Sequence, residues 1–149
     1  MERHRLTTLF ASVALMLSVT ACGPSLVIEN VDYSQPIESV LSVDGENQVH
    51  DQRYGIEFTI SSVLEEEGND SVDEVRLIRS SRGFYFLTAE GFNHVYVFES
   101  DESELKLKSK IHVSEEGIAQ PALNQRGSHI EVVDRSSGDT IRVNEEGRI

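Results

Sequence analysis

The sequence predicts an all-β protein built as an antiparallel meander or sandwich, and three observations support this fold class. Extended runs in which apolar and polar residues alternate recur along the chain. Short turns rich in glycine, aspartate, asparagine and serine separate these runs. After residue 22, no apolar pattern with helical spacing continues for three turns. Short strands joined by tight turns bury their apolar faces by packing one sheet on another.

Residues 1–21 have the layout of a secretory signal. Arg3 and Arg5 form a positively charged head, residues 6–19 form an apolar body, and Thr20-Ala21 supply two small residues at its end. The apolar run holds about 14 residues, including several with hydroxyl groups, whereas a membrane-spanning helix needs about 20 apolar residues. We therefore expect residues 1–21 to be removed from the mature protein.

Val19-Thr20-Ala21-Cys22 ends this segment and contains the only cysteine of the chain. It resembles the lipobox of bacterial lipoproteins. The resemblance implies a diacylglycerol thioether on Cys22, cleavage just before it, and usually a third acyl chain, such as palmitate, on the new amine. Two or three acyl chains, at about 0.8 kcal/mol for each buried methylene, hold a protein durably on a bilayer. The alternative is an ordinary secretory signal with a chance cysteine.

Residues 22–25 then form a lipidated tether, and residues 26–149 form a single β-rich domain. Gly23 takes the position where inner-membrane lipoproteins carry an aspartate, so the resemblance implies the periplasmic face of the outer membrane if the source has two membranes. At about 3.5 Å per extended residue, the tether reaches about 10 Å. We expect the domain to lie against the lipid headgroups of the cell envelope.

The charge of the chain narrows the choice of partners. The chain carries 13 basic and 26 acidic residues. Removal of residues 1–21, with two arginines and one glutamate, leaves about 128 residues with a formal charge of about −14, a size that fits one domain. Nucleic acids and anionic lipid headgroups require a basic surface, so both are excluded as electrostatic partners. The acidity favours solubility, and it also suits a cationic protein partner.

The first half of the domain contains extended runs at residues 26–31, 37–43, 48–50 and 54–64. Asp44-Gly45 lies between the second and third of these and is a hairpin signal. The last run alternates apolar and polar residues, as a half-buried strand does. Residues 65–71 are acidic, include a glycine and show no periodicity, so they predict a loop. A further strand is expected at residues 72–78.

The second half carries the strongest strand patterns. Residues 84–87 and 95–98 are apolar or aromatic at every position, as central strands buried on both faces are. Residues 105–113 alternate with period two. This alternation predicts an inward row and an outward lysine row, and a lysine row discourages pairing between sheet edges. The inward row is Leu105, Leu107, Ile111 and Val113, and the outward row is Lys106, Lys108 and Lys110.

The pattern Ile-x-Val-x-Glu-Glu-Gly occurs at residues 111–117 and again at residues 141–147. A hairpin precedes each copy, so two blade-like hairpin repeats are predicted. Residues 84–149 thereby resemble blades of a β-propeller. A closed propeller has at least four blades, and about two fit here. Either the hairpins are duplicated within a sandwich, or a partial propeller is completed by a homo-oligomer.

Common catalytic motifs are absent, and we predict that the protein is not an enzyme. Ser103 and Lys106 match the S-x-x-K spacing, but they fall in a turn and a strand without the companion elements. His50-Asp51 is expected in a turn. His94, His112 and His129 lie on predicted strands and could converge on a metal, although their solvent-exposed placement is the simpler expectation. No cofactor or metal site is predicted.

The leading functional hypothesis is a membrane-anchored, non-enzymatic binding or accessory module that contacts another envelope protein. The first alternative is an inhibitor or immunity-type lipoprotein that binds a cationic protein. The second is a metal-binding or enzymatic domain that uses His94, His112 and His129. Asn124-Gln125-Arg126-Gly127 is a predicted polar connection between the repeats and a candidate binding loop.

Overall fold

The computed structural model describes residues 37–102 and 104–149. The predicted signal at residues 1–21, the lipidation site Cys22 and its tether lie outside the described residues, as does the strand predicted at residues 26–31. The described part forms antiparallel sheets and one short helix, which confirms the all-β meander or sandwich. None of its helices is long and apolar enough to cross a bilayer.

The central sheet contains β1 (Ser39–Ser42), β4 (Glu74–Arg79), β5 (Tyr85–Ala89), β6 (His94–Asp101) and β7 (Glu104–His112). Their order in the sheet is β1-β4-β5-β6-β7. Strands β4 to β7 form a meander in which each strand pairs with the next, and β1 is added beside β4. All five strands fall within or overlap runs that the sequence predicts as extended.

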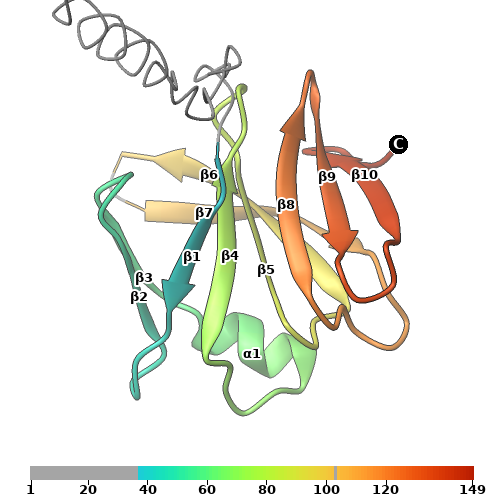
Figure 1. Cartoon of the computed structure of the whole chain (residues 1–149). Helices are drawn as coiled ribbons and strands as arrows, with labels where there is room; N and C mark the ends of the chain where they lie inside the picture. The colour runs from blue at the N-terminus through green and yellow to red at the C-terminus, as the bar shows by residue number, and fades with distance from the viewer. Residues whose placement is uncertain (1–36, 103) are drawn as a thin grey trace, which may run out of the picture. The chain divides into compact units, whose positions relative to one another are not determined.

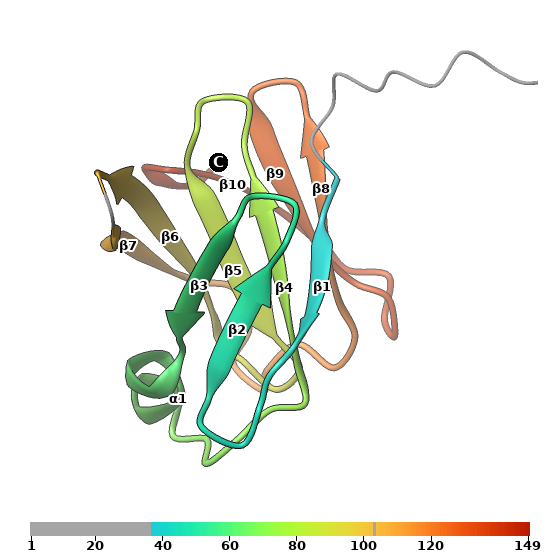
Figure 2. The same ribbon diagram turned by 90° about the vertical axis from the view of Figure 1, so that its left-hand side faces the viewer.

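A second sheet contains β8 (Pro121–Arg126), β9 (His129–Asp134), β10 (Thr140–Asn144) and β11 (Gly147–Arg148), again as a meander. A hairpin of β2 (Gln48–Asp51) and β3 (Ile56–Thr59) leads into the helix α1 (Ser61–Glu67). Figure 1 shows the central strands β1, β4 and β5 between the four-stranded sheet and the β2–β3 hairpin, and Figure 2 shows the hairpin in front of the central sheet. One copy of the repeated sequence pattern begins at the end of β7 and the other begins in β10, and these strands belong to different sheets.

The central sheet has an apolar core on each face. One face packs against the hairpin and α1, and its core includes Leu77, Leu87 and Tyr96. The other face packs against the four-stranded sheet, and its core includes Phe86 and Val97. All five residues of β5 are buried. This placement confirms that the runs around residues 84–87 and 95–98 are central strands.

The structure contradicts two adjacent predictions where they meet, the strand at residues 54–64 and the loop at residues 65–71. The strand ends at Thr59, and residues Ser61–Glu67 form α1, which Gly68 ends with a left-handed conformation. Ile60, Val63 and Leu64 are buried against the first core at the i, i+3, i+4 spacing of one helical face. The apolar stripe covers only one turn, so it is too short to show the sustained helical pattern.

The prediction that β7 keeps one apolar face is also wrong. The pairing of β6 with β7 shifts between Val97 and Phe98, whose partners are Ser109 and Leu107, so β7 has one extra residue there. Such a bulge exchanges the two faces of a strand. Leu105 therefore packs on the first core and Ile111 on the second, whereas Leu107 is 56% exposed.

The lysines of β7 separate for the same reason. Lys108 lies over the ring of Phe84, 5.4 Å from its centre, beside the second core. Lys110 forms an ion pair with Glu66 of α1, beside the first core. The predicted single outward row of lysines is therefore not formed.

Candidate functional site

Two histidines named by the sequence analysis meet beside a buried carboxylate. His94 and His112 are register partners on β6 and β7, with ring centres 5.2 Å apart. Nδ1 of His94 donates to Oε1 of Glu67, at 2.9 Å. The hydroxyl of Tyr96 donates to the same oxygen at 2.7 Å, and the backbone N–H of Asn93 donates to Oε2 at 2.7 Å.

These contacts make Glu67 a structural group. Its side chain is only 1% exposed, and three donors satisfy the carboxylate at the end of α1. Burial, followed by the hydrogen bond to Glu67, raises the pKa of Tyr96 well above its ordinary value. The phenol therefore stays a proton donor at neutral pH.

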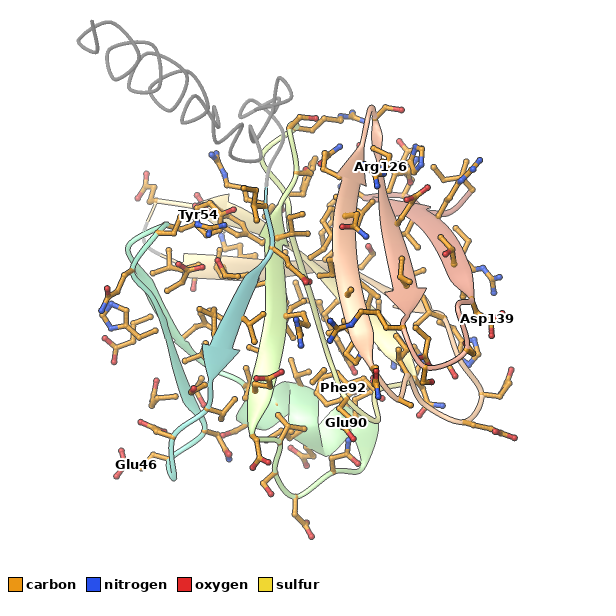
Figure 3. The ribbon with its side chains drawn as sticks, viewed as in Figure 1. Glu46, Tyr54, Glu90, Phe92, Arg126 and Asp139 are labelled. Atoms are coloured by element: carbon orange, nitrogen blue, oxygen red, sulfur yellow. The ribbon has the colours of Figure 1, made fainter. Side chains whose placement is uncertain are left out.

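The third histidine lies elsewhere. His129 begins β9 and pairs in register with Arg126, whereas His94 follows Phe92 by two residues. Figure 3 places Arg126 near the tip of the β8–β9 hairpin and Phe92 beside α1, in different parts of the molecule. Within residues 37–102 and 104–149, no group of three or more His, Cys, Asp or Glu side chains is arranged to hold a metal ion. The geometry of the described residues thus gives no three-histidine site.

A groove opens between β1 and β2. The two strands meet at the Val43–Val49 bridge, next to the turn where Oδ1 of Asp44 accepts from the backbone N–H groups of Glu46 and Gln48. Beyond this bridge β1 pairs with β4 and β2 pairs with β3, so the predicted Asp44-Gly45 turn forms but joins strands that separate (Figure 2). The resulting groove is about 680 Å³, within the range of about 300–1,000 Å³ that is usual for ligand sites.

The lining of the groove is acidic. Glu38, Asp44, Asp51 and Glu57 supply carboxylates, and Arg53 is the arginine among the lining residues. The guanidinium of Arg53 donates to the backbone carbonyl of Ile37 at 2.6 Å and closes the end of the groove opposite the Val43–Val49 bridge. The groove therefore attracts cations.

Asp51 is the unusual residue of this groove. Asp51 is only 1% exposed. Its Oδ1 accepts from the backbone N–H groups of Arg53 and Tyr54, at 2.7 and 3.4 Å. Its Oδ2 is buried and has no hydrogen-bond partner among the described residues. A buried polar oxygen without a donor costs free energy, so it points to a missing partner.

A smaller pocket of about 280 Å³ is lined by the end of β9, the start of β10 and the connection that follows β7. Asp134, one of the two acidic residues that line it, accepts from the hydroxyl of Ser136 and from the backbone N–H groups of Ala119 and Gln120. The Ser136 hydroxyl and then the backbone donors lower the pKa of Asp134 to about 2. Because its oxygens already accept these bonds, this carboxylate organises loops.

The predicted binding loop Asn124-Gln125-Arg126-Gly127 is corrected by the structure. Asn124, Gln125 and Arg126 belong to β8, and the turn that follows is tight. Gln125 is buried, accepts from the backbone N–H of Ser81 at 3.3 Å, and donates to the carbonyl of Gly127 at 2.7 Å. Gln125 therefore stabilises the turn instead of facing a ligand.

The β1–β2 groove is the site that the sequence analysis did not find. The turn predicted at His50-Asp51 is wrong, because both residues belong to β2. Asp51 ends this strand and its Oδ1 accepts from the turn that follows, while the burial of its carboxylate comes from the packing of β2 on the rest of the fold. A comparison with known proteins does not assign the chain to a family, because no family model, no curated protein and no solved structure matches it.

Proposed function

We propose that the protein is a membrane-anchored, non-enzymatic binding module of the bacterial cell envelope. In this proposal acyl chains on Cys22 hold it on the membrane, at the periplasmic face of the outer membrane if there are two membranes. The β1–β2 groove binds another envelope protein. The three-part signal and the lipobox resemblance of Val19-Thr20-Ala21-Cys22 support the anchor.

The observation that carries the binding role is the groove with its unsatisfied buried carboxylate. The groove is large enough for a ligand, and Oδ2 of Asp51 lacks a donor among the described residues. By contrast, the carboxylate of the histidine cluster is already saturated with hydrogen bonds from the protein. Binding at the groove is thus better supported than chemistry at the histidines.

Metabolic labelling with an alkyne analogue of palmitate tests the anchor. We expect the wild-type protein to be labelled and to fractionate with membranes, and the Cys22→Ser variant to lose both properties. Absence of label on the wild-type protein, or detection of the intact amino-terminal peptide by mass spectrometry, would overturn the anchor.

Site-specific photo-crosslinking in membranes tests the groove. Val40 lies on β1, lines the groove and is 48% exposed, so a photo-reactive residue there faces a bound partner. Arg142 is exposed on the four-stranded sheet and is the control position. We expect a discrete crosslinked product from position 40 and none from position 142. Equal products, or none from position 40, would contradict the binding role of the groove.

An inhibitor or immunity-type lipoprotein for a cationic protein is the second candidate. The acidic lining of the groove favours it. Binding to such a partner weakens strongly as salt rises, because ions screen the charges. A complex whose affinity does not change with salt would exclude this candidate.

Homo-oligomerisation remains the other prediction from the blade-like repeats. Glu131 on the four-stranded sheet pairs with Arg126 and Arg142, so the surface of that sheet away from the second core is charged. This charge disfavours stacking of another sheet there. Light scattering of the full-length protein in detergent tests the assembly, and a mass equal to one chain plus its micelle would exclude it.

A further inference from the structure

The groove best suits a ligand that carries a charged hydrogen-bond donor for Asp51. Oδ2 of Asp51 is buried and has no partner among the described residues. The nearest arginine along the chain, Arg53, is engaged with the carbonyl of Ile37. Strand alternation places the exposed His50 on the opposite face of β2 from Val49 and Asp51. Among the described residues, neither of these cationic side chains donates a hydrogen bond to Oδ2 of Asp51.

The surroundings of Asp51 exclude other ligand classes. Asp44 and Glu57 line the same groove and repel anions, whereas the third acidic residue, Glu38, is paired with Arg76. An apolar ligand would leave Oδ2 without a donor and would raise the cost of its burial. A metal ion needs several converging ligands, and the described residues contain no such group of three. An ammonium or guanidinium group remains.

The walls of the groove favour a cation that is carried by an extended chain. Both walls are strands, and β1 runs along one side from the Arg53–Ile37 contact to the Val43–Val49 bridge. Six residue steps of extended chain span roughly 20 Å, the length of a short peptide segment. Val40 of β1, which lines the groove and is 48% exposed, offers apolar contact to the methylene stem of a lysine or arginine.

We infer that the groove between β1 and β2 binds a basic segment of a partner protein in an extended conformation, with one lysine or arginine side chain against Asp51. This inference rests on the proposed binding function of the groove and names the chemistry of its partner. Asp51 supplies the charged hydrogen bond, and the other carboxylates supply long-range attraction.

The test measures binding of fluorescein-labelled eight-residue peptides to full-length, lipidated protein in detergent by fluorescence anisotropy. One peptide alternates lysine with valine, and its control replaces each lysine with glutamine. We expect the basic peptide to bind and the neutral peptide not to bind. Equal affinity for both peptides would overturn the inference, and so would spermidine binding more tightly than the basic peptide, because the groove would then select a small amine.

Two variants with the same change of charge locate the interaction. Asp51→Asn keeps the acceptor oxygen for the turn and removes the charge, whereas Glu90→Gln removes the charge of an exposed residue in the turn after β5, beside α1 (Figure 3). We expect Asp51→Asn to weaken binding of the basic peptide about tenfold or more and Glu90→Gln to change it less than twofold. Equal effects of the two variants would refute the role of Asp51.

A thermal melt shows whether the Asp51→Asn variant is folded, and its Tm is expected to equal or exceed that of the wild type because an unpaired buried charge is removed. Val40→Arg gives an independent test, since it adds a cation at an exposed groove position. It should abolish binding of the basic peptide, and retained affinity would overturn the inference. If the partner still crosslinks at position 40 in the Asp51→Asn protein, the groove binds a partner without this cation, and only the further inference falls.

Discussion

Glu67 and His94 are 27 residues apart in the sequence, yet Nδ1 of His94 donates to Oε1 of Glu67 at 2.9 Å. The contact joins the end of α1 to the start of β6. The same carboxylate holds the hydroxyl of Tyr96 and the backbone N–H of Asn93. One buried side chain therefore fixes the helix to the central sheet.

Replacement of Glu67 by alanine should destabilise the protein by about 3 kcal/mol or more, because it leaves several buried donors without an acceptor. Chemical denaturation of the full-length protein in detergent measures this loss. Glu65→Ala is the matched control, since Glu65 lies on the same helix and is exposed. The control should change the free energy of unfolding by less than about 0.5 kcal/mol. Similar losses in both variants would refute the structural role of Glu67.

The raised pKa of Tyr96 predicts a loss of stability in alkaline solution. In the unfolded chain the phenol ionises near its ordinary pKa of about 10. In the folded protein burial and Glu67 keep it protonated. The unfolded state then binds fewer protons than the folded state, so the free energy of unfolding falls as pH rises above that value.

Denaturation midpoints of the wild type and Tyr96→Phe, measured between pH 8 and pH 11, test this expectation. The phenylalanine variant should be less stable at pH 8 because it lacks the hydrogen bond to Glu67, and the difference should shrink as pH rises. A difference that stays constant across the range would show that Tyr96 ionises equally in both states.

Strands β5 and β6 of the central sheet could be predicted from local pattern, because apolar side chains are buried on both of their faces. Helix α1 could not be predicted, because its seven residues present only one turn of the apolar stripe. The alternation of Ile56, Phe58 and Ile60 also continues past the last strand residue, Thr59. The bulge in β7 could not be predicted, because the alternation keeps period two on both sides of it and only Ser109 interrupts the apolar row.

The candidate sites likewise depend on long-range contacts that the sequence pattern does not show. His94 is a candidate from its residue type, but its partner Glu67 lies at the end of α1, which the sequence predicts as a loop. The sequence predicts Asp51 in a turn, whereas it is the last residue of β2 and its Oδ1 accepts from the backbone of the turn that follows. The missing donor at Oδ2 depends on which strands enclose it, and neither sequence spacing nor residue type records that arrangement.

Asp134 predicts a loss of stability in acid. Its pKa is lowered to about 2 by the Ser136 hydroxyl and then by backbone donors, whereas the unfolded value is about 3.9. A lowered folded pKa contributes stability that is present above the unfolded pKa and is lost as pH falls through the folded pKa. Asp134→Asn should therefore lower the Tm at pH 7, and the gap from wild type should close as pH falls from about 4 towards 2.

Thermal melts of the full-length protein at several pH values check this prediction. Glu146→Gln is the control, because it makes the same change of charge at an exposed position of the turn after β10. Its Tm difference from wild type should be small at every pH. A gap for Asp134→Asn that does not narrow in acid would contradict the lowered pKa.

Gly117 and Gly138 form a matched pair that separates backbone strain from steric crowding. Both have φ of +83°, a conformation that favours glycine. A Cβ on Gly117 would lie 2.6 Å from the carbonyl oxygen of Gly91, whereas a Cβ on Gly138 would meet no atom within 4 Å. The neighbouring bonds from Gly91 N–H to the Ile118 carbonyl and from Ile118 N–H to the Phe92 carbonyl hold the two segments together.

Gly138→Ala should therefore cost about 1 kcal/mol for the left-handed backbone alone, and Gly117→Ala about 3 kcal/mol or more because the contact with Gly91 must also open. Chemical denaturation of the two variants measures the difference, and equal losses would mean that the chain around Gly117 yields without breaking this contact.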